Sequence, residues 1–123
     1  MSSAPGWLEA ILRQFGEGIG LKNFAMNERG AAVLRFETGS SLRFEYAFES
    51  LVIALQVPVA ADLAAFKRFL SLAHPERRGA FKLRVAYLSQ HDSILLAARL
   101  AEREVTLPVL NSVFGTLWQM AHS

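Results

Sequence analysis

Apolar residues between Phe24 and Val57 recur with a period of two, the spacing of strands that bury one face and expose the other. Turn residues interrupt the run at Glu28–Gly30 and at Thr38–Ser41. The clearest alternation places Leu42, Phe44, Tyr46 and Phe48 on one side. It predicts a strand that buries these four side chains. The segment is therefore predicted to be an antiparallel meander.

Charges in this meander favour one strand register. A three-residue loop at Gly39–Ser41 places Phe36 opposite Phe44 and Leu34 opposite Tyr46, so that the apolar faces coincide. The same register brings opposite charges together, at roughly 0.2–1 kcal/mol per pair. The predicted charge pairs are Glu37 with Arg43 and Arg35 with Glu45.

Helical spacing of apolar residues predicts three helices around these strands. The first covers Trp7–Gly18, the second Val59–His74, and the third follows an N-cap at Thr106. A second hairpin is expected from Phe81–Ser89 and Ser93–Glu102. With Phe24–Asn27 as the first of four early strands, the order is α-β-β-β-β-α-β-β-α. This order predicts a single α+β domain over residues 1–123, with three helices on an antiparallel twisted sheet.

The second predicted helix carries apolar residues over about half of its circumference, which is more than one sheet needs. Hydrophobic residues make up 52% of the chain, and this excess favours a further apolar contact. A homodimer is therefore expected. The predicted interface residues are Leu63, Phe66, Leu70 and, from the second hairpin, Leu88.

The net charge is only +2, but basic residues gather between Lys67 and Arg84. Such a patch can bind nucleic acid, but no aromatic stacking motif accompanies it. A solvated helix face and loop is the simpler interpretation. The cluster comprises Lys67, Arg68, Arg77, Arg78, Lys82 and Arg84, with His74 nearby.

Candidate catalytic and metal-binding residues are few. The chain has no Cys, and its three His are widely separated in the sequence. His91-Asp92 has the composition of a polar hairpin tip, while Glu102 and Glu104 have no obvious partner. We expect a protein without enzymatic activity, cofactor or metal. With no signal peptide and no apolar stretch long enough to span a bilayer, a cytoplasmic location is expected.

Short motifs in the first part of the chain resemble one family when taken in order. Phe15-Gly16, then Gly20-Leu21, then Asn27-Glu28-x-Gly30 follow one another, and Leu34–Gly39 has the form Leu-x-Phe-Glu-Thr-Gly. This order is similar to the class I type III secretion chaperones of the Tir-chaperone (CesT-like) family. Trp118 resembles an aromatic residue near the end of that family's final helix.

The resemblance implies a homodimeric chaperone that holds the N-terminal segment of a secreted effector in an extended, secretion-competent form. One alternative is a regulatory protein on the same scaffold that sequesters a transcription factor or a secretion component. Another is a basic nucleic-acid-binding α+β domain.

A client is expected to bind between the first helix and the strand Phe24–Asn27. A short first strand at a sheet edge would leave backbone groups unpaired for an extended peptide. Neighbouring apolar side chains would then select the client residues. The predicted client-binding residues are Leu8, Leu12, Phe24 and Met26.

Overall fold

The structure is a computed structural model that describes residues 5–58, 82–88 and 93–122. Within these ranges the chain forms two α-helices, one 3₁₀ helix and five strands. In chain order they are α1 (Gly6–Gly18), β1 (Ala31–Arg35), β2 (Ser41–Ala47), β3 (Ser50–Pro58), β4 (Lys82–Leu88), β5 (Ser93–Ala101), η2 (Glu102–Glu104) and α3 (Leu107–His122).

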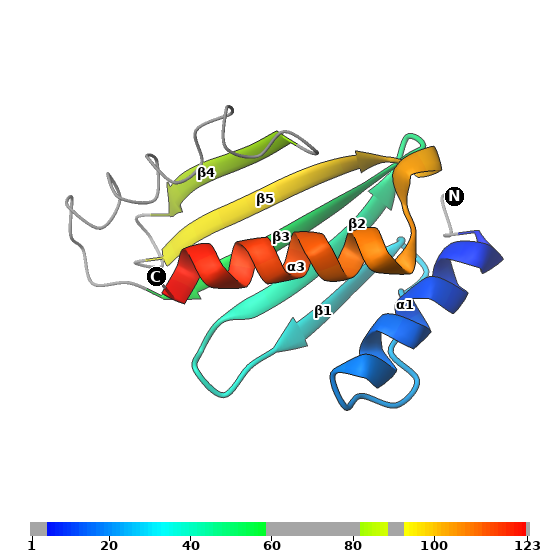
Figure 1. Cartoon of the computed structure of the whole chain (residues 1–123), viewed down its shortest axis with the longest axis horizontal. Coiled ribbons are helices and arrows are strands. Elements are labelled where there is room, and N and C mark those ends of the chain that lie inside the picture. The colour runs from blue at the N-terminus through cyan, green and yellow to red at the C-terminus, as the bar shows by residue number, and fades with distance from the viewer. Residues whose placement is uncertain (1–4, 59–81, 89–92, 123) are drawn as a thin grey trace.

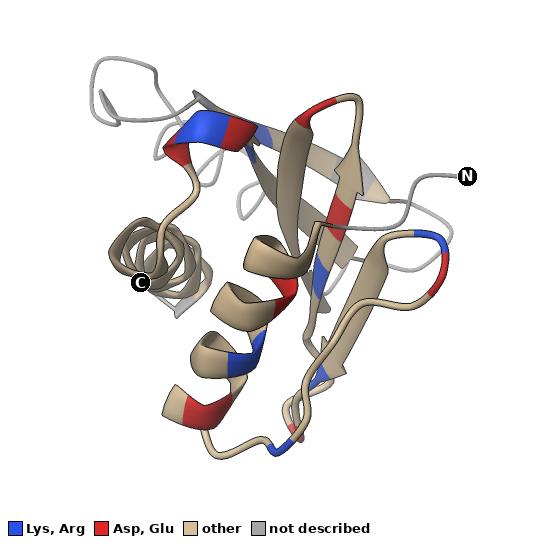
Figure 2. Ribbon diagram, turned by 90° about the vertical axis from the view of Figure 1, so that its right-hand side faces the viewer, with Lys and Arg blue, Asp and Glu red and all other residues tan. Residues whose placement is uncertain are grey.

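The strands form one antiparallel sheet in the order β1-β2-β3-β5-β4, and α1 and α3 lie on the same face of it (Figures 1 and 2). The core fills the space between the two layers. Phe15 of α1 contacts both Phe44 of β2 and Phe114 of α3 edge to face, with ring centroids 5.4 and 5.7 Å apart. The predicted α+β class with an antiparallel sheet is confirmed.

The predicted strand Phe24–Asn27 is wrong, because the segment has no strand ladder. Its only backbone hydrogen bond to β1 runs from the Asn27 amide to the Ala31 carbonyl, at 2.7 Å. Three strands, not four, therefore precede the second predicted helix. That helix, Val59–His74, lies outside the described residues.

The register of the β1–β2 hairpin also differs from the prediction. Leu34 pairs with Leu42, and Ala32 takes the place opposite Phe44. The loop has three residues as expected, but they are Glu37–Gly39. The Phe36 amide donates to the Ser40 carbonyl (2.9 Å), the Gly39 amide donates to the Phe36 carbonyl (3.0 Å), and Gly39 has a φ of 90°. Glycine tolerates this left-handed position, so the turn closes two residues earlier than predicted.

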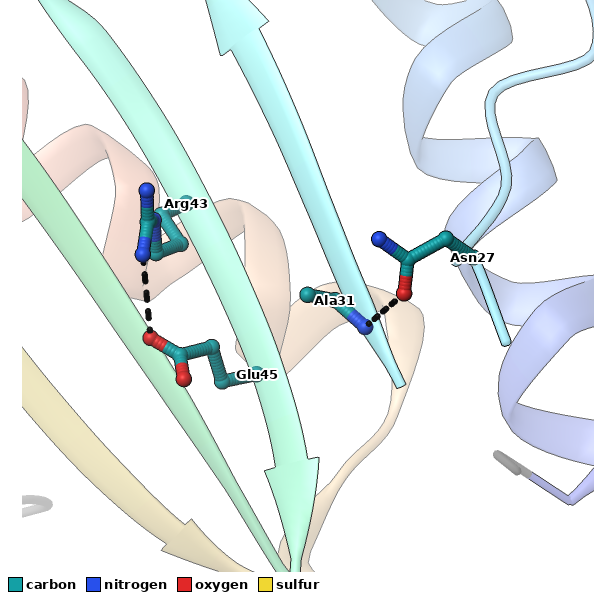
Figure 3. Close-up of polar contacts among 4 residues, drawn as sticks. All are labelled: Asn27, Ala31, Arg43 and Glu45. Atoms are coloured by element: carbon teal, nitrogen blue, oxygen red, sulfur yellow. Dashed lines mark hydrogen bonds and ion pairs between the residues drawn. The ribbon is translucent and has the colours of Figure 1, made fainter. Parts of the chain in front are cut away.

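The predicted cross-strand pairs, Glu37 with Arg43 and Arg35 with Glu45, are absent from this register. Arg43 instead pairs with Glu45 along its own strand, at 3.6 Å between Nη1 and Oε1 (Figure 3). Both side chains are more than half exposed, so the pair contributes little to stability. The hydrophobic faces still coincide, because the observed register differs from the expected one by an even number of residues.

Phe48, predicted to continue the buried face of β2, is 92% exposed. Ala47 pairs with Ser50, which leaves Phe48 and Glu49 as a two-residue turn between β2 and β3. Their φ angles are 53° and 60°, as a tight hairpin turn of this length requires. The alternation of apolar residues continues through the turn in the sequence, and this explains the error.

Glycines determine how α1 ends and how the next segment packs on it. The Leu21 amide donates to the Gly16 carbonyl (2.8 Å) and the Gly20 amide to the Glu17 carbonyl (3.2 Å), while Gly20 has a φ of 90°. This is a Schellman cap, which satisfies the last carbonyls of the helix. A Cβ atom on Gly16 would lie 2.5 Å from Cβ of Phe24. Gly16 therefore allows Phe24 to pack against the helix.

Gly16→Ala should lower the free energy of unfolding by roughly 1–3 kcal/mol, because the new methyl group meets the base of the Phe24 side chain. Gly18→Ala is the matched control. No atom lies within 4 Å of a Cβ at that position, so it should be neutral or stabilising by up to about 1 kcal/mol. Urea unfolding checks both values, and equal effects of the two variants would contradict the packing role of Gly16.

Candidate client-binding site

The outer edge of β1 is the candidate site, because among the described strands β1 pairs with β2 alone. The Tyr46 amide donates to the Gly30 carbonyl (2.8 Å), and the Phe36 amide donates to the Ser40 carbonyl (2.9 Å). Even-numbered positions along this strand therefore bond to β2. In an antiparallel ladder the alternate residues direct their backbone groups outward. In β1 these residues are Ala31, Val33 and Arg35.

Asn27 forms hydrogen bonds with the outward-facing backbone amide and carbonyl of Ala31. Its amide donates to the Ala31 carbonyl at 2.7 Å, and its side-chain Oδ1 accepts from the Ala31 amide at 3.1 Å (Figure 3). The same Oδ1 accepts from the Arg29 amide at 2.9 Å. This bond stabilises the turn between Asn27 and Gly30. No described residue bonds the outward groups of Val33 or Arg35. The free edge of β1 therefore consists of these two residues.

Apolar side chains flank this free edge on both faces of the sheet. Val33 is 43% exposed on the face away from the helices. On the helix side, Leu34 and Phe36 are half-buried. The Phe36 ring stacks on Phe114 with centroids 6.1 Å apart and lies 5.0 Å from Trp118. A strand added here would find unpaired backbone groups and apolar contacts for alternate side chains.

The four residues predicted to bind a client pack inside the molecule. Leu8 and Leu12 have no exposed side-chain area, and Met26 is buried. Phe24 is half-buried, with its ring 5.8 Å from Phe44. These side chains fill the space between α1 and the sheet. Their contact with a client stays a prediction.

Of the predicted dimer residues, only Leu88 is described, and it is half-buried in the edge strand β4. Leu63, Phe66 and Leu70 lie outside the described residues, as does His91-Asp92. The basic cluster lies there too, apart from Lys82 and Arg84. Arg84 is exposed.

The sequence pattern alone did not point to Val33 or Arg35 as candidate site residues. It placed the sheet edge one segment earlier, at Phe24–Asn27. A signal was present in the spacing of Asn27 and Gly30, because an asparagine three residues before a glycine is typical of a turn closed by the asparagine side chain. A turn at this point makes the next strand, β1, the edge of the sheet.

Two glutamates that have no obvious partner in the sequence, Glu102 and Glu104, accept hydrogen bonds in the structure. Glu102 accepts from the Tyr46 hydroxyl at 3.0 Å, and Glu104 accepts from the Ala101 amide at 2.8 Å. In the part of the chain that the structure describes, no three His, Asp or Glu side chains gather as metal ligands. No helix there is long and apolar enough to cross a bilayer.

Comparison with known proteins identifies the family. The family model for the type III secretory system chaperone SycN matches residues 7–123. The chain therefore belongs to this family of type III secretion chaperones. The resemblance to type III secretion chaperones is confirmed at this level. No curated protein matches the sequence.

Several solved structures share the fold at low sequence identity. The structure described as the ExsC–ExsE complex superposes with a TM-score of 0.74 at 18% identity, covering 98% of this chain and 92% of that one. The HopA1–SchA chaperone–effector complex gives 0.68 at 14%, covering 95% and 94%. The ExoU–SpcU complex from the type III secretion system of Pseudomonas aeruginosa gives 0.65 at 14%, covering 90% and 92%.

The bond from Tyr46 to Glu102 predicts a pH dependence. The pKa of Tyr46 is raised above its ordinary value, first by desolvation, then by this hydrogen bond and by the charges of Glu102 and Glu49. The neutral hydroxyl is the form that donates. The contribution is therefore complete below the unfolded-state pKa of about 10 and is lost as the pH rises through the folded-state value.

Tyr46→Phe should therefore lower the free energy of unfolding at neutral pH, with a deficit relative to the wild type that shrinks in strongly alkaline buffer. Urea unfolding across this range measures the deficit. The difference between the tyrosinate absorbance titrations of the wild type and the variant isolates Tyr46, and its midpoint should lie above the ordinary tyrosine value of about 10. Equal stability of the two proteins at neutral pH would contradict a contribution from this bond.

Proposed function

We propose that this protein binds the N-terminal region of a secreted effector as an extended segment added to the free edge of β1. The observation that carries the proposal is the pair of residues Val33 and Arg35, whose outward backbone groups have no partner among the described residues. Binding of this kind needs no nucleotide, metal or catalytic residue, because it depends only on a higher affinity for the extended state of the client. The site of action is the bacterial cytoplasm.

The side chains around the edge support an extended client rather than a folded one. In a strand, successive side chains point to opposite faces, so a client strand beside β1 would direct alternate residues toward Val33 and toward Leu34 and Phe36. Backbone bonds accept many sequences, while these apolar contacts give selectivity. The complexes named for the structural neighbours support an effector as client, including the chaperone–effector pair HopA1–SchA.

Placement in the Tir-chaperone (CesT-like) subfamily is a further part of the proposal, based on the motif order around Phe15-Gly16 and Gly20-Leu21. A regulator on this scaffold would use the same edge. Deletion of the gene separates the two: loss of a chaperone reduces export of the captured protein, whereas loss of a regulator changes the transcription of other genes.

Val33→Pro tests strand addition. Proline removes an outward amide and leaves the bonds to β2 in place, so the fold should be retained. We expect the client captured from native cytosol, identified by mass spectrometry, to be lost from the variant. Val33→Ala keeps the amide and should retain most of the binding. If the Val33→Pro protein is folded and still holds its client, the edge of β1 is not the binding site.

Leu34→Pro is the matched disruptive control. Leu34 pairs with Leu42, and its amide points toward β2, so this proline removes a bond within the sheet. Loss of folded protein is expected for Leu34→Pro and not for Val33→Pro. Circular dichroism and thermal unfolding distinguish the two variants.

We also propose a homodimer, in which Leu88 and the predicted residues Leu63, Phe66 and Leu70 contribute to the interface. The half-buried position of Leu88 on an edge strand supports this. Sedimentation equilibrium at micromolar concentration should give twice the mass of one chain. Leu88→Asp should shift the distribution toward the monomer, because a buried unpaired charge is unfavourable at an apolar interface. A monomeric wild type would contradict the proposal.

A further inference from the structure

The turn between β2 and β3 displays an aromatic side chain on a rigid support. Phe48 and Glu49 both have left-handed backbone angles, which disfavour residues other than glycine by about 1–2 kcal/mol each. The Glu49 carbonyl accepts from the Glu102 amide at 2.9 Å, and the Ser50 hydroxyl donates to the Ala47 carbonyl at 3.0 Å. Hydrogen bonds thus hold an unfavourable backbone in place while Phe48 projects into solvent.

An open groove of about 1280 Å³ lies beside this turn. Among the described residues, its basic lining comes from Arg84 on β4, Arg99 on β5 and Arg103 on η2, all of which are exposed. The Arg99 Nε donates to Ser50 Oγ at 3.1 Å. This hydrogen bond restrains the position of the guanidinium group. No carboxylate in the described part of the chain forms an ion pair with any of the three arginines.

Apolar surface adjoins the arginines in the same groove. Trp7, at the start of α1, is 41% exposed, and Phe48 is 92% exposed. Val52 is half-buried in the groove, on the face of β3 opposite the core. Aromatic residues and arginines dominate the binding energy at many protein interfaces, and a rigid support reduces the entropy lost when they bind.

The charges in the groove favour a polypeptide over a nucleic acid. Arginine forks match carboxylates in a two-bond geometry. Glu49 and Glu102 also line the groove and would repel a continuous row of phosphates, whereas a peptide can place acidic and apolar side chains at separate points. We propose that this surface, the arginine groove, binds an acidic, extended polypeptide segment that packs an apolar side chain against Phe48.

This site is separate from the edge of β1. The described lining residues of the arginine groove come from α1, β3, β4, β5, η2, the β2–β3 turn and the residue that follows η2, and none comes from β1. Binding of an acidic peptide in the arginine groove is therefore expected to be independent of a substitution at Val33.

Fluorescence anisotropy with labelled synthetic peptides tests the proposal. A decapeptide that alternates glutamate and leucine should bind at least tenfold more tightly than its lysine–leucine counterpart, and added salt should weaken it. Arg84→Ala, Arg99→Ala and Arg103→Ala should each weaken binding severalfold. Arg13→Ala is the matched control, since Arg13 is exposed on α1 and does not line the groove. The Val33→Pro protein should bind this peptide as the wild type does.

Phe48→Asn separates binding from folding. Asparagine accepts left-handed backbone angles more readily than phenylalanine, so the melting temperature should stay the same or rise. Affinity for the glutamate–leucine peptide should nevertheless fall.

Equal binding of the two peptides would overturn the proposal, as would an equal loss of affinity in Arg13→Ala and the three groove variants. Tighter binding of a single-stranded oligonucleotide than of the acidic peptide would assign the groove to nucleic acid instead. Unchanged affinity in Phe48→Asn would show that Phe48 does not contact the peptide.

Discussion

Pairing between β3 and β5 is the interaction on which the rest of the structure depends. The ladder runs from Ser50 opposite Ala101 to Pro58 opposite Ser93 and joins the early meander to the late hairpin. The inward residues of both strands are buried and form the floor of the core. Phe15 then connects the layers, because its ring meets β2 on one side and α3 on the other. Without this central pairing neither helix would have a continuous apolar surface on which to pack.

Local sequence signals predicted most of the individual elements. The helical spacing and glycines of the first segment gave α1 to within one residue, and Thr106 caps α3 through its side chain, as expected. Apart from the strand predicted at Phe24–Asn27, the predictions that failed concern turns. The β1–β2 loop ends at Gly39 because this glycine adopts a positive φ. The alternating pattern also did not show that Phe48 lies beyond the end of β2. Turn position depends on individual backbone angles, which period-two patterns do not record.

The sheet edge was predicted one segment too early, and the client-binding residues named from the sequence stay a prediction. An extended-peptide site at a sheet edge near the first helix was expected from the sequence, but that edge is β1 rather than Phe24–Asn27. Apolar side chains that looked available in the sequence are buried: Leu8 and Leu12 have no exposed side-chain area. A sequence alone does not distinguish an apolar residue that packs within its own chain from one that is exposed and binds another protein. The pairing of β3 with β5, and therefore the edge position of β4, also depends on contacts between distant residues.

The bonds between Asn27 and Ala31 have a consequence for how this protein behaves at high concentration. Unpaired edge strands can join one another from molecule to molecule, and sheet proteins avoid this by shortening or covering their edges. Here one asparagine covers the first part of the edge, and among the described residues a gap two residues long remains, with a charged side chain at Arg35. Two residues offer too few backbone bonds to hold two copies together firmly. A long flexible client bound at this proposed site could add contacts elsewhere along the surface, so the short gap would favour such a client over aggregation with identical copies.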